Sequence, residues 1–276
     1  MPSRTPRRRS RNPNDLRKHV VGAALALLAL SALSAGAYVY TTAARPPVLD
    51  RSSLCPVDGP RSVTVALLDS TDNIPEIAKR EVKTSLVDMA ETLPTYGLLE
   101  LRLLDPKVPG GRSIFARCNP GDGSGLSEYT ANPLLAKKRW MDGFREPLDE
   151  ALQIGLRPLP GKTSPIMETV QRIAVERFTG RAAEEIPKSL ILISDMLEHE
   201  PDYSQYSGDL SYGRYKASRA YKKFRTNLYG AEVTIYYIQR LSAKPINSAD
   251  HIRFWAEWIH DNNGRLKQAN KLQGVG

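Results

Sequence analysis

The sequence is poor in cysteine, histidine and aromatic residues. Its 276 residues include two cysteines and four histidines, and phenylalanine, tryptophan and tyrosine together make up 7%. Two cysteines are too few for a small scaffold held together by disulfides. Hydrophobic residues nevertheless make up 41% and charged residues 25%, which is enough to bury a core and excludes a wholly disordered protein. The length allows one large domain or two small ones.

An excess of one sign of charge is also missing from most of the chain, although the net charge is +9. Residues 1–19 hold seven basic residues and one aspartate, whereas residues 46–276 hold 31 basic and 29 acidic residues. A protein that binds nucleic acid carries its basic surface on the folded domain. The charge distribution therefore predicts no nucleic-acid partner.

One long apolar run stands out in residues 20–40, VVGAALALLALSALSAGAYVY. As a helix it would be about 31 Å long, close to the thickness of the hydrocarbon core of a bilayer. The arginine-rich residues 1–19 precede it, so the positive-inside rule places them in the cytoplasm and the rest of the chain outside it. We predict a retained transmembrane helix in a bacterial inner membrane, with the main domain in the periplasm. A signal peptide cleaved near the small residues 34–37 is the alternative.

The predicted periplasmic location bears on the state of the two cysteines. An oxidising compartment favours a disulfide between Cys55 and Cys118, and two free thiols are the alternative. A metal site built on them is not expected, because the sequence has no CxxC pair and no nearby histidines.

The rest of the chain predicts one α/β domain. Residues 41–61 are rich in proline and in small and polar residues, which predicts a linker. From residue 62 onward, apolar strand patterns alternate with amphipathic helix patterns. The predicted strands are 62–68, 98–104, 112–117, 189–194 and 231–238, and the predicted helices are 74–93, 133–154, 166–178, 213–228 and 249–262. This alternation predicts a doubly wound, mostly parallel sheet with helices on both faces, in a domain covering residues 62–276.

Polar side chains follow two of the buried strands, and two hydroxyl residues precede a helix. In an open α/β sheet, ligands bind at the carboxyl ends of the strands, near the point where the strand order reverses. Carboxylate and hydroxyl oxygens at that edge suit Mg²⁺, Mn²⁺ or Ca²⁺. The candidate ligands are Asp69, Thr71, Asn73, Thr163, Ser164 and Asp195.

In these residues the chain resembles the von Willebrand factor A (VWA) domain family. The metal-ion-dependent adhesion site of that family reads D-x-S-x-S after the first strand, a threonine before a later helix, and an aspartate after the fourth strand. Asp69 matches the first aspartate, Thr71 the first hydroxyl and Asp195 the last aspartate. Ser164, which is followed by proline and isoleucine, matches the threonine, and Thr163 is the neighbouring alternative.

Two positions depart from the family pattern. Asn73 stands where the second serine belongs, and Met196 stands where many family members have glycine. The resemblance covers roughly residues 62–262. It implies a non-catalytic interaction module that holds a divalent cation with an open coordination position, which an aspartate or glutamate of a protein partner fills.

Enzymes are the competing class. A metal-dependent hydrolase, for example a phosphatase, could use the same strand-end carboxylates. Gly161-Lys162-Thr163 looks like the end of a phosphate-binding loop, but the preceding glycine, Gly155, lies one residue too far away. A haloacid dehalogenase-type phosphatase would need an aspartate at Thr71. No G-x-S-x-G motif supports a serine hydrolase.

The segment after Asp195 predicts a surface loop over residues 196–212. Tyr203, Tyr206 and Tyr212 would lie at the rim of the metal site, where rigid amphipathic side chains suit protein recognition. Packing against the next helix is the alternative for these tyrosines. The acidic residues of the loop predict solvated charge, with a second cation site as the alternative. They are Glu198, Glu200, Asp202 and Asp209. The basic face of helix 213–228 predicts an ordinary solvated surface or, alternatively, a docking surface for acidic groups.

Overall fold

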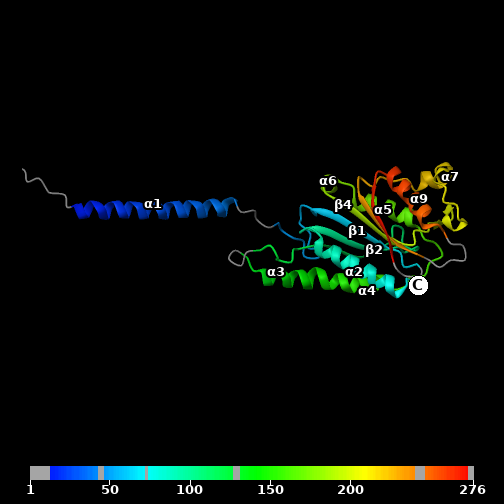
Figure 1. Ribbon diagram of the computed structural model, residues 1–276, viewed down its shortest axis with the longest axis horizontal. Coiled ribbons are helices and arrows are strands. Elements are labelled where there is room, and N and C mark those ends of the chain that lie inside the picture. Colours follow the sequence, from blue (N-terminus) through cyan, green and yellow to red (C-terminus); the bar gives the residue numbers. More distant parts are fainter. Residues whose placement is uncertain (1–12, 43–46, 72–73, 127–130, 240–245, 273–276) are drawn as a thin grey trace, which may run out of the picture. The chain divides into compact units, whose positions relative to one another are not determined.

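The computed structural model describes residues 13–42, 47–71, 74–126, 131–239 and 246–272 (Figure 1). The chain divides into two units, residues 1–47 and 48–276. The first unit contains helix α1 (Pro13–Thr42), with exposed leucine and valine side chains. Its segment Arg17–Thr41 is long and apolar enough to cross a membrane, judged by length and composition.

The second unit begins earlier than the sequence suggests. Leu49 forms a β-bridge with Pro56, and the Cys118 N–H donates to the Ser53 carbonyl at 2.8 Å. The predicted disulfide between Cys55 and Cys118 is present. Residues 48–61 are therefore part of the compact domain, and the predicted linker over 41–61 is too long. The sequence shows no sign of this, because hydrogen bonds and the disulfide hold residues 48–61 in place and no regular apolar pattern is needed there.

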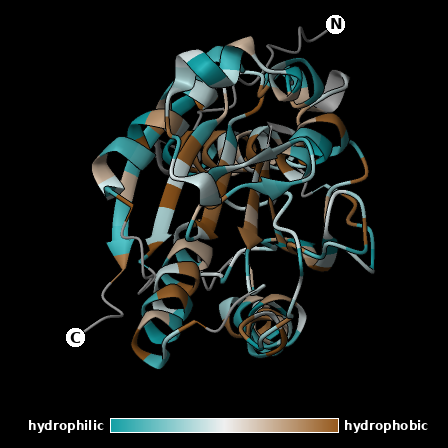
Figure 2. Cartoon of the chain, turned by 90° about the vertical axis from the view of Figure 1, so that its right-hand side faces the viewer, coloured by the Kyte–Doolittle hydropathy of each residue, from teal (hydrophilic) through white to brown (hydrophobic). Residues whose placement is uncertain are grey.

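Six of the described strands form one sheet in the order β3-β2-β1-β4-β7-β8 (Figure 1). They are β1 (Ser62–Leu68), β2 (Gly97–Leu103), β3 (Arg112–Cys118), β4 (Lys188–Ser194), β7 (Glu232–Ile238) and β8 (Arg265–Leu272). Every neighbouring pair is parallel except β2 with β3. Strands β1 and β4 lie at the centre, and their apolar side chains are buried on both faces. Figure 2 shows these hydrophobic strands between the helical layers.

Helices cover both faces of the sheet (Figure 1). One face packs against α2 (Glu76–Thr92) and a continuous helical rod of α3 (Pro133–Trp140), a π-helical turn η1 (Met141–Arg145) and α4 (Glu146–Gly155). The other face packs against α5 (Ile166–Arg177), α7 (Tyr212–Ala217), α8 (Arg219–Lys223) and α9 (Ser248–Asp261). A short helix α6 (Arg181–Glu184) precedes β4. The predicted fold class is confirmed.

Three elements differ from the prediction. Strand β8 was not predicted, because its sequence RLKQANKL is mostly polar and it lies exposed at the sheet edge. The predicted helix 213–228 is divided into α7 and α8, because Ser218 adopts an extended conformation. The predicted surface loop 196–212 contains a small hairpin of β5 (His199–Glu200) and β6 (Tyr203–Ser204), followed by a 3₁₀ turn η2 (Gln205–Ser207).

Candidate functional site

The central strands bring Asp69 and Asp195 to the same edge of the sheet. Strands β1 and β4 are parallel neighbours, with Leu68 opposite Ile193, and the Asp69 N–H donates to the Ile193 carbonyl at 2.9 Å. Each aspartate follows the carboxyl end of its strand, and both side chains are buried, with 6% of each residue exposed. This is the edge at which the chain reverses its strand order, where α/β sheets bind ligands.

Hydroxyl groups surround the Asp69 carboxylate. Its Oδ1 accepts hydrogen bonds from the Thr71 hydroxyl at 2.6 Å and from the Thr71 N–H at 3.1 Å. Its Oδ2 accepts from the Ser194 hydroxyl at 2.7 Å and from the Ser164 hydroxyl at 3.3 Å. Of the predicted ligands, Asp69, Thr71, Ser164 and Asp195 therefore gather at one place. Thr163 is half-buried one residue earlier, and the predicted ligand Asn73 lies outside the described residues.

The segment after Asp195 holds Ser164 and the start of α5 in place. The Ser164 backbone pairs with His199 in both directions, at 2.9 and 3.0 Å. The neighbouring Glu198 is fully buried, and its carboxylate accepts a hydrogen bond from the Met167 N–H at 2.8 Å, in the first turn of α5. A carboxylate is favourable at a helix N-terminus, where N–H groups lack partners within the helix. Desolvation nevertheless raises the pKa of Glu198 well above its usual value.

The surroundings of Asp195 destabilise its charged form. Burial, and to a smaller extent the Asp69 carboxylate, raise the pKa of Asp195 to about 8, although the Leu197 N–H donates to its Oδ1 at 2.9 Å. A divalent cation between two such carboxylates would offset this repulsion. The arrangement is thus a set of oxygen donors of the kind that divalent cations bind in proteins.

The backbone at Met196 supports the sequence match at this position. Met196 has a φ of 62°, in the left-handed region that glycine adopts most easily. It occupies the position where the VWA pattern has glycine in many members, and its backbone has a conformation that glycine adopts without strain. The Met196 N–H donates to the Ser194 hydroxyl at 2.8 Å, and its carbonyl accepts from the Trp255 indole at 2.8 Å. These two hydrogen bonds hold the strained residue in place.

The tyrosines of the 196–212 segment have two different environments. Tyr203 packs against Tyr215 and Phe254, with ring centroids 4.9 and 6.1 Å apart, and the buried Tyr212 donates its hydroxyl to Asp261 at 2.9 Å. Tyr212 is thus a core side chain at the start of α7, and Tyr203 packs half-buried against the same core. Both positions agree with the alternative raised by the sequence, in which these tyrosines pack against the next helix.

Tyr206 is the tyrosine that stays at the rim, and 51% of it is exposed. Its ring contacts that of His199 at a centroid distance of 5.0 Å. Partial burial raises the pKa of its hydroxyl, and the negative charges of Asp195 and Asp69 raise it further, which places the hydroxyl within their electrostatic reach.

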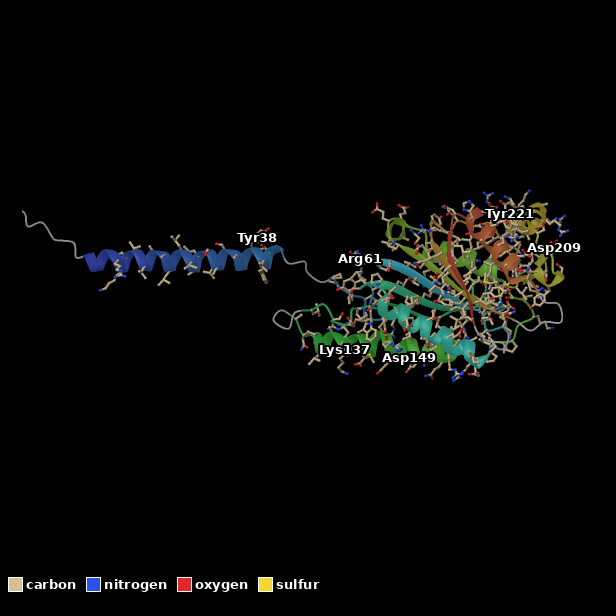
Figure 3. The ribbon with its side chains drawn as sticks, viewed as in Figure 1. Tyr38, Arg61, Lys137, Asp149, Asp209 and Tyr221 are labelled. Carbon is tan, nitrogen blue, oxygen red and sulfur yellow. A yellow bond between two sulfur atoms is a disulfide. The ribbon has the colours of Figure 1, made fainter. Side chains whose placement is uncertain are left out.

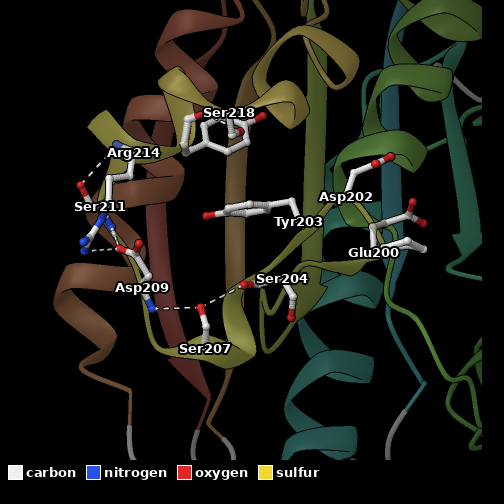
Figure 4. A pocket seen from close by; sticks show the side chains of 11 residues that line it. Glu200, Asp202, Tyr203, Ser204, Ser207, Asp209, Ser211, Arg214 and Ser218 are labelled. Carbon is white, nitrogen blue, oxygen red and sulfur yellow. Dashed lines mark hydrogen bonds and ion pairs between the residues drawn. The ribbon is translucent and has the colours of Figure 1, made fainter.

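The acidic residues of the segment lie in three separate places. Glu198 is buried at α5, whereas Glu200 and Asp202 both lie near the Lys223 ammonium, at 3.5 and 2.7 Å. Asp209 pairs with Arg214 at 2.7 Å, on the far side of Tyr203 (Figure 4). No cluster of three or more metal-binding side chains is found in the described part of the chain. The alternative of a second cation site in this segment is therefore not supported.

Two contributions to the site were not predicted from the sequence. Ser194 donates to Asp69, and its signal was a small hydroxyl residue directly before Asp195 in an otherwise apolar strand. Gln205 is fully buried, and its side-chain oxygen accepts from the Glu198 N–H at 3.0 Å and lies 3.1 Å from His251 Nε2. No local pattern could have shown this contact, because His251 belongs to α9.

The chain matches no protein-family model, and it matches no curated protein. Solved structures with similar folds include the conserved hypothetical protein BatB from Bacteroides thetaiotaomicron, at 15% identity, with a TM-score of 0.40, over 76% of this chain and 91% of that one. A von Willebrand factor type A protein from Catenulispora acidiphila is 14% identical, with a TM-score of 0.41, over 76% of this chain and 38% of that one. An aerotolerance-related membrane protein from Bacteroides fragilis is 13% identical, with a TM-score of 0.34, over 77% of this chain and 91% of that one.

These likenesses are weak, and the strand order of the chain itself establishes the fold. A doubly wound sheet with an antiparallel edge strand, and with polar residues after its first and fourth strands, is the arrangement that the resemblance to VWA domains implies.

Proposed function

We propose that this chain is a membrane-anchored interaction module that binds a divalent cation at the carboxyl edge of its sheet. The observation that carries the proposal is the convergence of Asp69, Thr71, Ser164 and Asp195, from three separate segments, on one buried spot. Asp69, Thr71 and Ser164 would coordinate the cation, and Asp195 would do so directly or through water. Mg²⁺, Mn²⁺ and Ca²⁺ all prefer such oxygen donors.

The partner would be a protein that presents an aspartate or glutamate side chain. A cation held by two carboxylates and neutral hydroxyls keeps a coordination position for another oxygen ligand, so binding would depend on the metal. Exposed Tyr206, at the rim, would add contact area around that carboxylate.

Helix α1 would anchor the chain in the membrane. Its segment Arg17–Thr41 has the length and composition of a membrane-spanning helix. The basic residues 1–19 favour a cytoplasmic N-terminus, so the VWA-like domain would lie in the periplasm of a bacterial inner membrane. The disulfide between Cys55 and Cys118 fits an oxidising compartment.

Thermal unfolding of the full chain in detergent, stripped of metal with a chelator, tests the cation site. A ligand present at 100 times its dissociation constant stabilises the native state by about 2.7 kcal/mol. For a domain of this size, this predicts a rise in the unfolding midpoint of roughly 5–10 °C on addition of Mg²⁺, Mn²⁺ or Ca²⁺. Asp69→Ala should abolish the rise.

Asp88→Ala, which removes an exposed aspartate from α2, is the matched control and should retain the rise. An equal rise in Asp69→Ala would place the cation elsewhere, and no rise in the wild type at millimolar metal would refute the site. Hydrolysis of a phosphate ester that is lost in Asp69→Asn would instead favour the hydrolase alternative.

A further inference from the structure

The opposite end of the VWA-like domain exposes a group of large apolar side chains. Most of the domain's apolar side chains are buried, yet Leu134 is 81% exposed and Leu135 is 53% exposed. Singly exposed apolar residues are common, but a group of them indicates an interaction surface. We call the following residues the apolar tip: Val48, Val57, Leu126, Leu134 and Leu135.

Contacts within the domain hold the segments of the apolar tip together. Cys55 and the Ser53 carbonyl fix residues 48–57 to Cys118, at the end of β3. The chain after β3 packs on the first turn of α3, since a Cβ added at Gly123 would lie 2.9 Å from both the Ala136 Cβ and the Pro133 carbonyl. Figure 3 shows Lys137 of α3 and Arg61, the residue before β1, both toward the end of the domain opposite Asp209.

Helix α3 carries two leucines of the tip and, directly after them, three basic residues. We call Lys137, Lys138 and Arg139 the basic belt. The sequence of α3 is PLLAKKRW, and the helix exposes Leu134 and Leu135 in the first turn and then Lys137, Lys138 and Arg139. Leucines beyond a ring of long basic side chains are typical of segments that enter the boundary between lipid headgroups and acyl chains. Each lysine or arginine near an anionic membrane surface strengthens binding.

We propose that the apolar tip inserts into the headgroup region of the bilayer that α1 spans, with the basic belt contacting anionic phospholipid. The inference rests on the proposed role of α1 as an anchor. Helix α1 ends at Thr42 and the compact domain begins at Val48, itself a residue of the tip. The residues between them, 43–47, can cover at most about 18 Å when fully extended. The anchor therefore keeps the tip close to the membrane surface at very high local concentration.

Other basic side chains of the domain are less suited to this role. Arg214 pairs with Asp209, Lys216 with Asp261, and Lys223 with both Glu200 and Asp202. In the basic belt, Lys138 pairs with Asp142 at 2.8 Å. The structure thus moves the lipid-docking surface from the basic face of helix 213–228, an alternative raised by the sequence, to α3.

Quenching by brominated phospholipid tests the proposal in the full chain. The chain is reconstituted into vesicles of phosphatidylglycerol and phosphatidylcholine, with bromine at a shallow or a deep position of the acyl chains. A tryptophan is added by Leu134→Trp, and the emission of the wild type is subtracted. Val175→Trp is the matched control, because Val175 is an exposed apolar residue on the outer side of α5. Leu28→Trp reports on α1 itself.

We expect shallow bromine to cause a loss of the added emission in Leu134→Trp and not in Val175→Trp. Deep bromine should act on Leu28→Trp. Quenching of Leu28→Trp without quenching of Leu134→Trp would overturn the docking proposal and leave the anchor intact. Quenching of Leu134→Trp alone would support the docking and refute the anchor, and quenching of neither would refute both.

The basic belt has a separate test in the same vesicles. Combining Lys137→Gln with Arg139→Gln in the Leu134→Trp background should reduce the quenching in vesicles rich in phosphatidylglycerol. In vesicles of phosphatidylcholine alone the change should be smaller. Equal quenching with and without the two substitutions would remove the basic belt from the proposal.

Discussion

The two ends of the sheet depart in opposite ways from the usual pattern of buried apolar and exposed polar side chains. At the carboxyl edge, charged and hydroxyl side chains are buried, as in Asp69 and Asp195. At the amino edge, apolar side chains are exposed, as in Leu134 and Leu135. Buried carboxylates and exposed leucines both cost free energy, so each departure marks a place where something else is expected to bind.

The two ends are also held in different ways. Hydrogen bonds between side chains far apart in the sequence organise the carboxyl edge, such as Ser164 with Asp69 and Gln205 with His251. A covalent bond fixes the amino edge through Cys55. The first end therefore responds to protonation and, by our proposal, would respond to cations, whereas the second responds to the redox state of its disulfide.

The largest effect is expected when the disulfide at the amino edge is removed. The disulfide closes a loop between residues 63 positions apart. In the chain-entropy model, Cys55→Ser combined with Cys118→Ser lowers the free energy of unfolding by about 4 kcal/mol. Denaturant titration of the full chain measures this, and reductant should lower the stability of the wild type while leaving the double variant unchanged. A double variant as stable as the oxidised wild type would show that the covalent bond does not stabilise the native state.

A smaller effect should appear at the carboxyl edge as the pH falls. Desolvation lowers the pKa of the buried His251 from 6.5 to about 4. Because the folded pKa lies below the unfolded one, the neutral ring stabilises the fold above pH 6.5, and this contribution is lost as the pH falls toward 4. The loss is on the order of 3 kcal/mol.

The difference between the stability profiles of wild type and His251→Gln isolates this contribution. The buried carboxyls of Asp195 and Glu198 have raised pKa values and act in the opposite direction, and both chains contain them. His260→Gln, an exposed position on the same helix α9, should follow the wild type between pH 7 and pH 4. Parallel profiles for wild type and His251→Gln would contradict the assignment to His251.

The smallest effect is expected from the loss of the N-terminal cap of α3, the helix that carries the exposed leucines. The Asn132 side chain accepts the Leu135 N–H at 3.0 Å and caps this helix. Asn132→Ala should lower the free energy of unfolding by about 1 kcal/mol, and Asn132→Asp should preserve most of it, because aspartate also caps helices. Urea titration of both variants measures the difference. Equal losses in the two variants would mean that the cap is not the cause.

The sequence predicted the central elements well because their signals are local. Strand β1 has the predicted bounds, and β4 begins one residue earlier than predicted, since unbroken apolar runs bounded by polar residues identify buried strands. Strand β8 was missed because an edge strand needs few apolar residues. The break at Ser218 was missed because the helical pattern continues on both sides of it.

The candidate site divides along the same line. Asp69, Thr71, Ser164 and Asp195 could be predicted because each stands directly at the end of a strand or the start of a helix. The interior position of Tyr203 and Tyr212 could not, because it depends on Phe254 and Asp261, about fifty residues away in the sequence. Tertiary partners, and not local composition, decide which side chains of the 196–212 segment remain exposed.

Both outer strands of the sheet carry positive charge. Arg112 and Arg117 lie on β3, and Arg265, Lys267 and Lys271 lie on β8. An unguarded sheet edge can pair with a strand of another molecule, and basic side chains discourage such pairing. Copies confined to one membrane plane meet their neighbours far more often than copies in free solution. Like-charged borders would let many of these domains crowd a membrane without polymerising edge to edge.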